Sequence, residues 1–105
     1  DYPASPYNPL LGIHSLVNRK TEKGLPFSSE QAITVKEALR MYTIDAAYAS
    51  FDEGVKGSIE SGKLADLVVL AENPLEVAKE KIKDIEVALT IVGGEIVYRN
   101  PRISL

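Results

Sequence analysis

The stretch GSIESGKLADLVVL, residues 57–70, decides how this sequence is interpreted. It predicts a short strand at 57–59, a reversal at Ser61–Gly62 and a second strand that ends at Leu70. The glycine of the reversal supplies the positive φ that a tight turn requires. Because apolar side chains lie on both sides of the second strand, we expect that strand to be covered on both faces.

A two-glycine turn, Gly93-Gly94, separates two apolar segments at 87–92 and 95–98 and predicts a β-hairpin. A two-residue loop sets the register, so that four large apolar side chains fall on one face of the hairpin. They form two expected cross-strand pairs, Ile91 with Ile96 and Leu89 with Tyr98. The other face has a mixed composition, and we expect it to be the wetter one.

The N-terminal part of the sequence predicts a loop followed by a helix. Prolines recur over residues 1–9 and predict irregular structure there. Apolar residues then recur at helical spacing along one face of a segment over 10–19: Leu10, Ile13 and Val17. Ser28 is expected to cap a single helical turn.

A second helical region begins at Thr34, which forms a predicted capping box with Glu37. Its expected buried side chains are Val35, Ala38, Leu39 and Tyr42. Thr43 is expected to cap a further short helix that ends near Ser50.

Asn73 and Pro74 predict the N-cap and the first turn of a helix over 74–82. The predicted order is therefore helices first, then three or more strands with one intervening helix. That order indicates an α+β fold for the chain as it stands.

Composition excludes several classes of function. The formal net charge of −3 argues against a nucleic-acid-binding protein, which requires a basic face. The 105 residues include no cysteine, so the sequence offers no disulfide framework, thiolate nucleophile or cysteine-based zinc site. The apolar stretches are shorter than the 18 or so residues of a membrane helix. We expect a cytoplasmic protein with neither nucleic-acid nor membrane partners.

Residues 57–70 closely resemble the sequence in which metal-dependent amidohydrolases leave their catalytic barrel and enter a small β-sandwich. The resemblance extends to DYPASPYNPLLGI and TVKEALRMYTIDAAYAS upstream and to KDIEVALTIVGGEIVY downstream, and so covers nearly the whole chain. It is strongest to amidohydrolase family 3, the branch that includes N-substituted formamide deformylases.

The resemblance implies a division of the chain into two parts. Residues 1–56 would be the loop and last helices of a (β/α)8 barrel, and residues 57–105 the β-sandwich-forming segment with one intervening helix. A complete barrel needs about 250 residues, and the chain opens on Asp1 without an initiator methionine, so we expect a C-terminal fragment. Its strands would pair with the remainder of the same polypeptide, and the fragment alone is expected to self-associate.

The resemblance also implies a chemistry, the hydrolysis of C–N bonds other than peptide bonds. In this family a divalent metal activates a water molecule, and a carboxylate takes and returns its proton. Asp1 matches that carboxylate and would also contact the metal, with zinc as the expected ion in the intact enzyme. Tyr2 and Tyr7 are candidates for lining the pocket of a small-molecule substrate, with ordinary loop packing as the alternative.

Other polar residues are given structural roles. His14 lies in an apolar helical segment and is expected to pack there rather than bind a metal. Asp66 is expected to accept hydrogen bonds from backbone N–H groups at a turn. One carboxylate without imidazole partners cannot form a three- or four-ligand zinc site, so we expect the fragment alone to bind no catalytic metal and to be inactive.

A second hypothesis belongs to a different class. The chain could be a non-catalytic structural or interaction module derived from the same family. The sequence does not separate the two hypotheses, because the metal-binding histidines are missing from these residues in both cases. The coding sequence upstream of Asp1 would separate them, since an HxH motif on a predicted strand selects the enzyme.

Overall fold

The computed structural model describes residues 8–18 and 33–104 of the chain. Helices precede a three-stranded antiparallel sheet, which confirms the predicted α+β order. The elements are the α-helices α1 (Pro9–Asn18), α2 (Val35–Met41) and α3 (Ile44–Ala49), the 3₁₀ helix η2 (Lys79–Asp84), and the strands β1 (Leu67–Leu70), β2 (Val87–Val92) and β3 (Glu95–Arg99).

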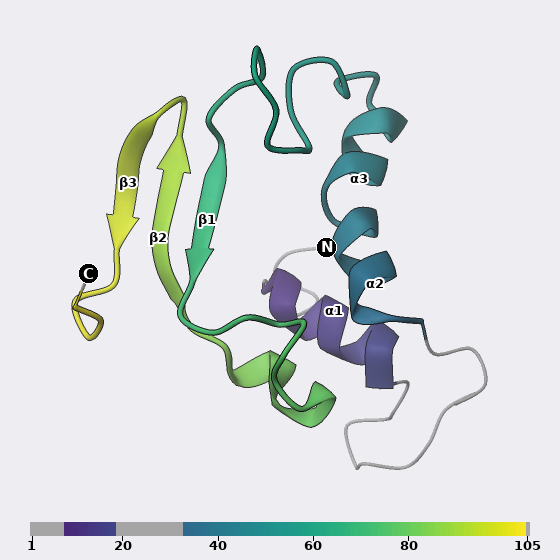
Figure 1. Ribbon diagram of the computed structural model, residues 1–105, viewed down its shortest axis with the longest axis vertical. Helices are drawn as coiled ribbons and strands as arrows, with labels where there is room; N and C mark the ends of the chain where they lie inside the picture. The colour runs from purple at the N-terminus through teal and green to yellow at the C-terminus, as the bar shows by residue number, and fades with distance from the viewer. Residues whose placement is uncertain (1–7, 19–32, 105) are drawn as a thin grey trace.

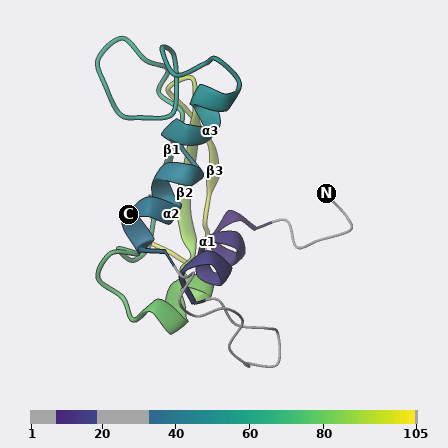
Figure 2. The ribbon, with the colours of Figure 1, turned by 90° about the vertical axis from the view of Figure 1, so that its right-hand side faces the viewer.

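The helices flank one edge of the sheet. The strand order is β1-β2-β3, and in Figure 1 α2 and α3 lie beside β1 while β3 lies farthest from them. In the view turned by 90°, the three strands stand one behind another, behind α2 and α3 (Figure 2). The helical layer therefore faces the β1 edge and leaves much of both sheet faces open.

The hydrophobic core lies where α1, α2 and η2 meet. Its buried side chains are Leu10, Ile13, Val17, Ala38, Ile82 and Ile85, and the first three confirm the predicted face of α1. Ile82 is fully buried, and removing such a side chain from water stabilises a fold by about 1.5–3 kcal/mol. The buried amide of Asn18 adds a polar link, because Nδ2 donates to the Lys79 carbonyl at 2.9 Å.

Helix α1 begins one residue earlier than the sequence predicts. Pro9 is its first residue, and the Leu10 N–H donates to Asn8 Oδ1 at 3.0 Å. Proline suits this position, because its missing N–H would have no partner in the first turn. The predicted loop over 1–9 is therefore wrong at its last residue. The remainder of that loop and the turn expected at Ser28 lie outside the described residues.

The predicted capping box of α2 is confirmed. The Glu37 N–H donates to the Thr34 hydroxyl at 3.1 Å, and the Thr34 N–H donates to the Glu37 carboxylate at 3.0 Å. Ala38 is buried as expected, but Tyr42 is exposed. Its hydroxyl lies over α1 at Gly12, where an added Cβ would come within 1.9 Å of it. Tyr42 thus reaches across to a neighbouring helix instead of entering the core.

The expected capping role of Thr43 is wrong. Its hydroxyl donates to the Leu39 carbonyl at 2.7 Å and makes no cap hydrogen bond to α3. At the other end of α3, the Asp52 N–H donates to the Ala47 carbonyl at 2.8 Å around Phe51, whose φ is +63°. This is the Schellman geometry, in which glycine is the usual left-handed residue.

The strand expected at 57–59 is absent, and those residues form an irregular segment against α3. Gly57 has a φ of +99°, and a Cβ there would come within 2.8 Å of Ala47 Cβ. The positive φ takes the backbone off an extended path at Gly57, and the close approach to α3 leaves no room for a side chain there. Gly62, in contrast, has the predicted positive φ, at +94°.

The helix expected over 74–82 is divided into two short elements. Asn73 caps a turn as predicted, because its Oδ1 accepts from the Leu75 N–H at 2.9 Å. Ala78 is extended, with a ψ of 136°, and interrupts the helical path. The 3₁₀ helix η2 then places Ile82 against α1.

The hairpin of β2 and β3 follows the predicted register only near its turn. Both turn glycines have positive φ, as in a type I′ turn, and Ile91 pairs with Ile96 as expected. Beyond that pair, Val97 is an extra residue in β3, so Tyr98 pairs with Thr90 instead of Leu89. The bulge thereby moves Tyr98 to the other face of the sheet.

The expectation that β1 is covered on both faces is wrong for the described chain. Val68 is 53% exposed, and every residue of β3 is exposed. The described residues supply no layer over this part of the sheet, which explains the exposure of these apolar side chains. Among residues 8–18 and 33–104, no helix is long or apolar enough to cross a membrane.

Candidate functional site

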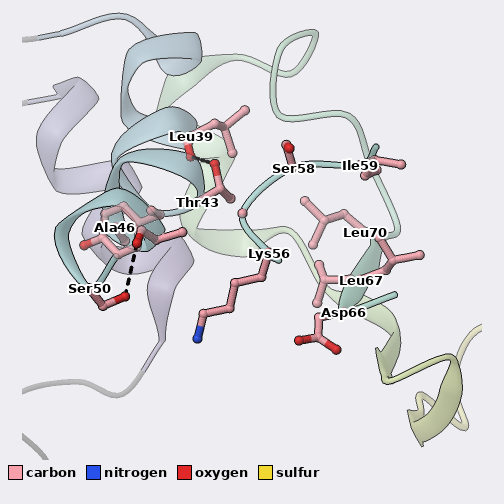
Figure 3. Close-up of a pocket in the computed structure, with 14 residues that line it drawn as sticks. Leu39, Thr43, Ala46, Ser50, Lys56, Ser58, Ile59, Asp66, Leu67 and Leu70 are labelled. Carbon is pink, nitrogen blue, oxygen red and sulfur yellow. Dashed lines mark hydrogen bonds between the residues drawn. The ribbon is translucent and has the colours of Figure 1, made fainter. Parts of the chain in front are cut away.

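A groove of about 530 Å³ lies between the β1 edge and the α2–α3 segment. Figure 3 shows side chains from both walls facing this space. Its apolar lining comes mainly from the two helices and β1: Leu39, Ala46, Ala47, Leu67, Val68 and Leu70. Lys56, Ser58 and Asp66 contribute the polar part of the rim, from the segment that connects α3 to β1.

The connecting segment is held in place by a small polar network. Lys63 Nζ donates to Ser58 Oγ at 2.8 Å and lies 3.2 Å from the Glu60 carboxylate. The Ser58 hydroxyl donates to the same carboxylate. This hydroxyl, together with the Lys63 ammonium, lowers the pKa of Glu60 below its ordinary value. The network joins three residues of one loop and thereby stabilises the wall beside β1.

The polar side chains on the groove walls already have partners in the fold. Thr43 donates to Leu39, as described above, and Ser50 Oγ donates to the Ala47 carbonyl at 3.2 Å. Lys56 Nζ lies 3.6 Å from an Asp52 carboxylate oxygen. The groove therefore offers apolar contact rather than an arranged acid–base pair.

Asp66 has the structural role that its position predicts. Its Oδ1 accepts from the Gly93 N–H at 2.8 Å, and the neighbouring Ala65 carbonyl accepts from the Gly94 N–H at 3.0 Å. These two bonds fasten the tip of the β2–β3 hairpin to the start of β1. The turn that Asp66 supports is thus the hairpin turn, 27 residues away in sequence.

The predicted catalytic and substrate-binding residues, Asp1, Tyr2 and Tyr7, lie outside the described residues. His14 lies half-buried on α1, as predicted, and its Nδ1 accepts from the Lys83 N–H at 3.3 Å. Within residues 8–18 and 33–104, no group of three or more His, Cys, Asp or Glu side chains could hold a metal ion. The described part of the chain therefore does not provide a metal centre.

The amidohydrolase family profile matches residues 1–98, nearly the whole chain. The chain belongs to the amidohydrolase family. Among curated proteins, it is 40% identical over 98 residues to an N-substituted formamide deformylase of Arthrobacter pascens, a match that covers 93% of this chain and 18% of that protein. It is 36% identical over 101 residues to the protein LONG AFTER FAR-RED 3 of Arabidopsis thaliana, covering 93% of this chain and 17% of that one.

A solved amidohydrolase structure from Thermotoga maritima has a similar fold. The TM-score is 0.52 at 22% identity, and the alignment covers 87% of this chain and 26% of that protein. This amidohydrolase chain thus spans less than a fifth of the curated relatives and about a quarter of the solved structure.

Proposed function

We propose that this chain is the C-terminal part of a metal-dependent hydrolase that acts on C–N bonds other than peptide bonds. The main support is the 40% identity to a formamide deformylase, which extends over 93% of the chain. The small share of that relative's length supports the proposal that the rest of the enzyme lies in another part of the polypeptide.

Asp1 is the proposed proton-transferring carboxylate and a ligand of the divalent metal, which we take to be zinc. The family match that begins at residue 1 supports this assignment. Because the described residues do not provide a metal centre, the other ligands are proposed to lie beyond this chain. Tyr2 and Tyr7 are proposed to contact a small-molecule substrate. The 105 residues alone are then expected to be inactive.

The proposed architecture assigns residues 1–56 to the end of a (β/α)8 barrel and residues 57–105 to a composite β-sandwich. The exposed apolar side chains of the sheet support this division, because a second sheet would cover them. The same exposure supports self-association of the chain when the rest of the polypeptide is missing. Neither nucleic acid nor a membrane is a proposed partner, and the cytoplasmic location stays a prediction.

Hydrolysis of an N-substituted formamide tests the proposal. The longer polypeptide that contains this chain should release formate, and a metal chelator should abolish the reaction. Asp1→Asn should lower kcat by about a hundredfold or more, because a positioned general acid–base group contributes about that much. The 105-residue chain should show no turnover.

Two results would contradict the proposal. Turnover by the 105 residues alone would show that the chain needs no further ligands. A longer polypeptide that neither binds a metal nor hydrolyses the formamide would select the alternative, a non-catalytic structural or interaction module.

A further inference from the structure

The joint between α1 and η2 contains two hydrogen bonds that meet at one imidazole nitrogen. The backbone N–H of Lys83, in η2, donates to His14 Nδ1 at 3.3 Å. Asn18 Nδ2, in α1, donates to the Lys79 carbonyl of η2 at 2.9 Å and lies 3.4 Å from the same Nδ1. Two N–H donors, one from each element, therefore surround a single ring nitrogen.

Neither of these donors can become an acceptor in this geometry. The Lys83 group is a backbone N–H, which only donates. The Asn18 amide keeps its orientation although its Oδ1 is buried with no hydrogen-bond partner in the described part of the chain. Turning this amide over would place Oδ1 against the carbonyl oxygens of His14 and Lys79, to which Nδ2 now donates at 2.9 Å. His14 Nδ1 is therefore the unprotonated acceptor, and the proton of the neutral ring lies on Nε2.

We propose that His14 is a pH-sensitive switch between α1 and η2, which links the two elements while Nδ1 is unprotonated and gives up one of their hydrogen bonds when Nδ1 gains a proton. A proton on Nδ1 would face the Lys83 N–H, donor against donor, and that bond would be lost. If the Asn18 amide turned over to accept the new proton, its bond to Lys79 would be lost instead. This inference uses contacts within the fold alone and is independent of the proposed hydrolase activity.

The charges on the elements around α1 act in the same direction. Helix α1 itself carries no Asp, Glu, Lys or Arg. The charged side chains on the two elements that pack against it are Lys79, Glu80, Lys81, Lys83 and Asp84 on η2 and Lys36, Glu37 and Arg40 on α2. The Asp84 carboxylate pairs with Lys83 Nζ at 3.1 Å, and that of Glu37 caps α2. Basic groups outnumber acidic ones on both elements, which disfavours an added proton on the imidazole.

The sign of the pH dependence follows from the protonation state that the joint requires. Because the linked state holds Nδ1 unprotonated, its contribution is present above the ordinary histidine pKa of about 6.5 and is lost as the pH falls below that value. Mild acid should therefore loosen the contact between α1 and η2 before the carboxylates of the chain begin to titrate, at about pH 4.

NMR of the wild-type chain follows the proton and the hydrogen bond together. The ¹⁵N signals of the His14 ring should show the Nε2–H tautomer at about pH 7.5 and titrate as the pH is lowered to about 5. The Lys83 amide signal should shift with the same midpoint as the ring. The Gly94 amide, which donates to the Ala65 carbonyl at 3.0 Å away from this joint, should not follow that midpoint.

A matched variant, His14→Asn, separates the switch from other effects of acid. The asparagine side-chain oxygen lies two bonds from Cβ, as Nδ1 does, so it can accept from Lys83 but does not titrate. Urea unfolding of both chains measures the folding equilibrium constant at about pH 7.5 and about pH 5. Over this range the constant of the wild-type chain should fall about threefold or more relative to that of His14→Asn.

Three results would overturn the inference. The first is a ring proton on Nδ1 at about pH 7.5, since Nδ1 could then not accept from Lys83. The second is a Lys83 amide signal that stays constant while His14 titrates. The third is an equal loss of stability in the wild-type chain and in His14→Asn. The first two measurements need no substitution, so they decide the question even if His14→Asn does not fold.

Discussion

Apolar side chains are buried in the core formed by α1, α2 and η2, whereas many of those on the sheet of β1–β3 are exposed to solvent. Ile82 in η2 is fully buried, whereas Ile96 in β3 is 51% exposed. The core is closed by side chains that lie within the described residues, some of them more than 60 positions apart in sequence. The three strands of the sheet are hydrogen-bonded to one another, but within the described residues no second layer packs over their exposed apolar side chains. Among the described residues, one region is thus buried within the chain, whereas the apolar side chains of the other stay exposed.

The largest expected effect is at Ile82. Ile82→Ala should lower the free energy of unfolding of the chain by about 2–5 kcal/mol, because it opens a cavity in a packed core. The matched control, Ile96→Ala, should cost less than about 1 kcal/mol, because that side chain is half exposed. Urea unfolding of the two variants measures the difference. Equal losses would show that the sheet is covered in the isolated chain.

Gly57 tests whether the groove wall is as closely packed as the core. Gly57→Ala should cost about 2 kcal/mol or more, because the positive φ disfavours a side chain and the new Cβ meets Ala47. At Gly54 an added Cβ meets no atom within 4 Å, so Gly54→Ala should change stability by less than about 0.5 kcal/mol. Thermal unfolding compares them. A harmless Gly57→Ala would mean that this loop does not pack on α3.

Asp66 links the groove to the hairpin. Asp66→Ala should cost about 1 kcal/mol, because the Gly93 N–H loses its acceptor. Asp66→Asn keeps an oxygen at the same position and should retain most of the stability. Hydrogen exchange at Gly93 reports the bond directly. The proposed enzyme should keep its kcat with Asp66→Ala, so a loss of activity at unchanged melting temperature would give Asp66 a role in the reaction.

The smallest effect is a pH dependence at the start of α2. Hydrogen bonds from the Thr34 backbone N–H and hydroxyl lower the pKa of Glu37 below its ordinary value of 4.5. Since the folded chain holds the ionised form, this contribution is present above the ordinary pKa and is lost as the pH falls through the lowered one. The stability difference between the wild-type chain and Glu37→Ala should therefore shrink in acid. Urea unfolding from about pH 7 to pH 3 checks it. In a Thr34→Ala background the effect should be smaller but still present, because that change removes the hydroxyl and keeps the backbone N–H donor.

Local signals predicted much of the fold. The capping box at Thr34 and the Gly93-Gly94 turn act over three or four residues, so the sequence contains all their determinants. The bulge at Val97 and the outward position of Tyr42 depend on contacts with other elements, and the sequence pattern did not predict them. The start of α1 was predictable but missed, because Asn8-Pro9 repeats the signal recognised at Asn73.

The candidate site was less predictable than the fold. The groove joins residues 39–50 with residues 56–70, and no local pattern places a helix wall beside a strand edge. The acceptor role of Asp66 was predictable from its place before a strand, but its partner, Gly93, was not. Asp1, Tyr2 and Tyr7 were selected by family resemblance and stay predictions.

The bond between Asn18 and Lys79 joins residues 61 positions apart, and it has a consequence for biosynthesis. Helix α1 leaves the ribosome well before η2 has been translated, and at about 5–20 residues per second the delay is roughly 3 to 12 seconds. During that interval the apolar stripe of α1 has no cover from η2. Apolar surface exposed in this way during synthesis is prone to aggregation, so slower translation of the intervening codons would lengthen the period of risk.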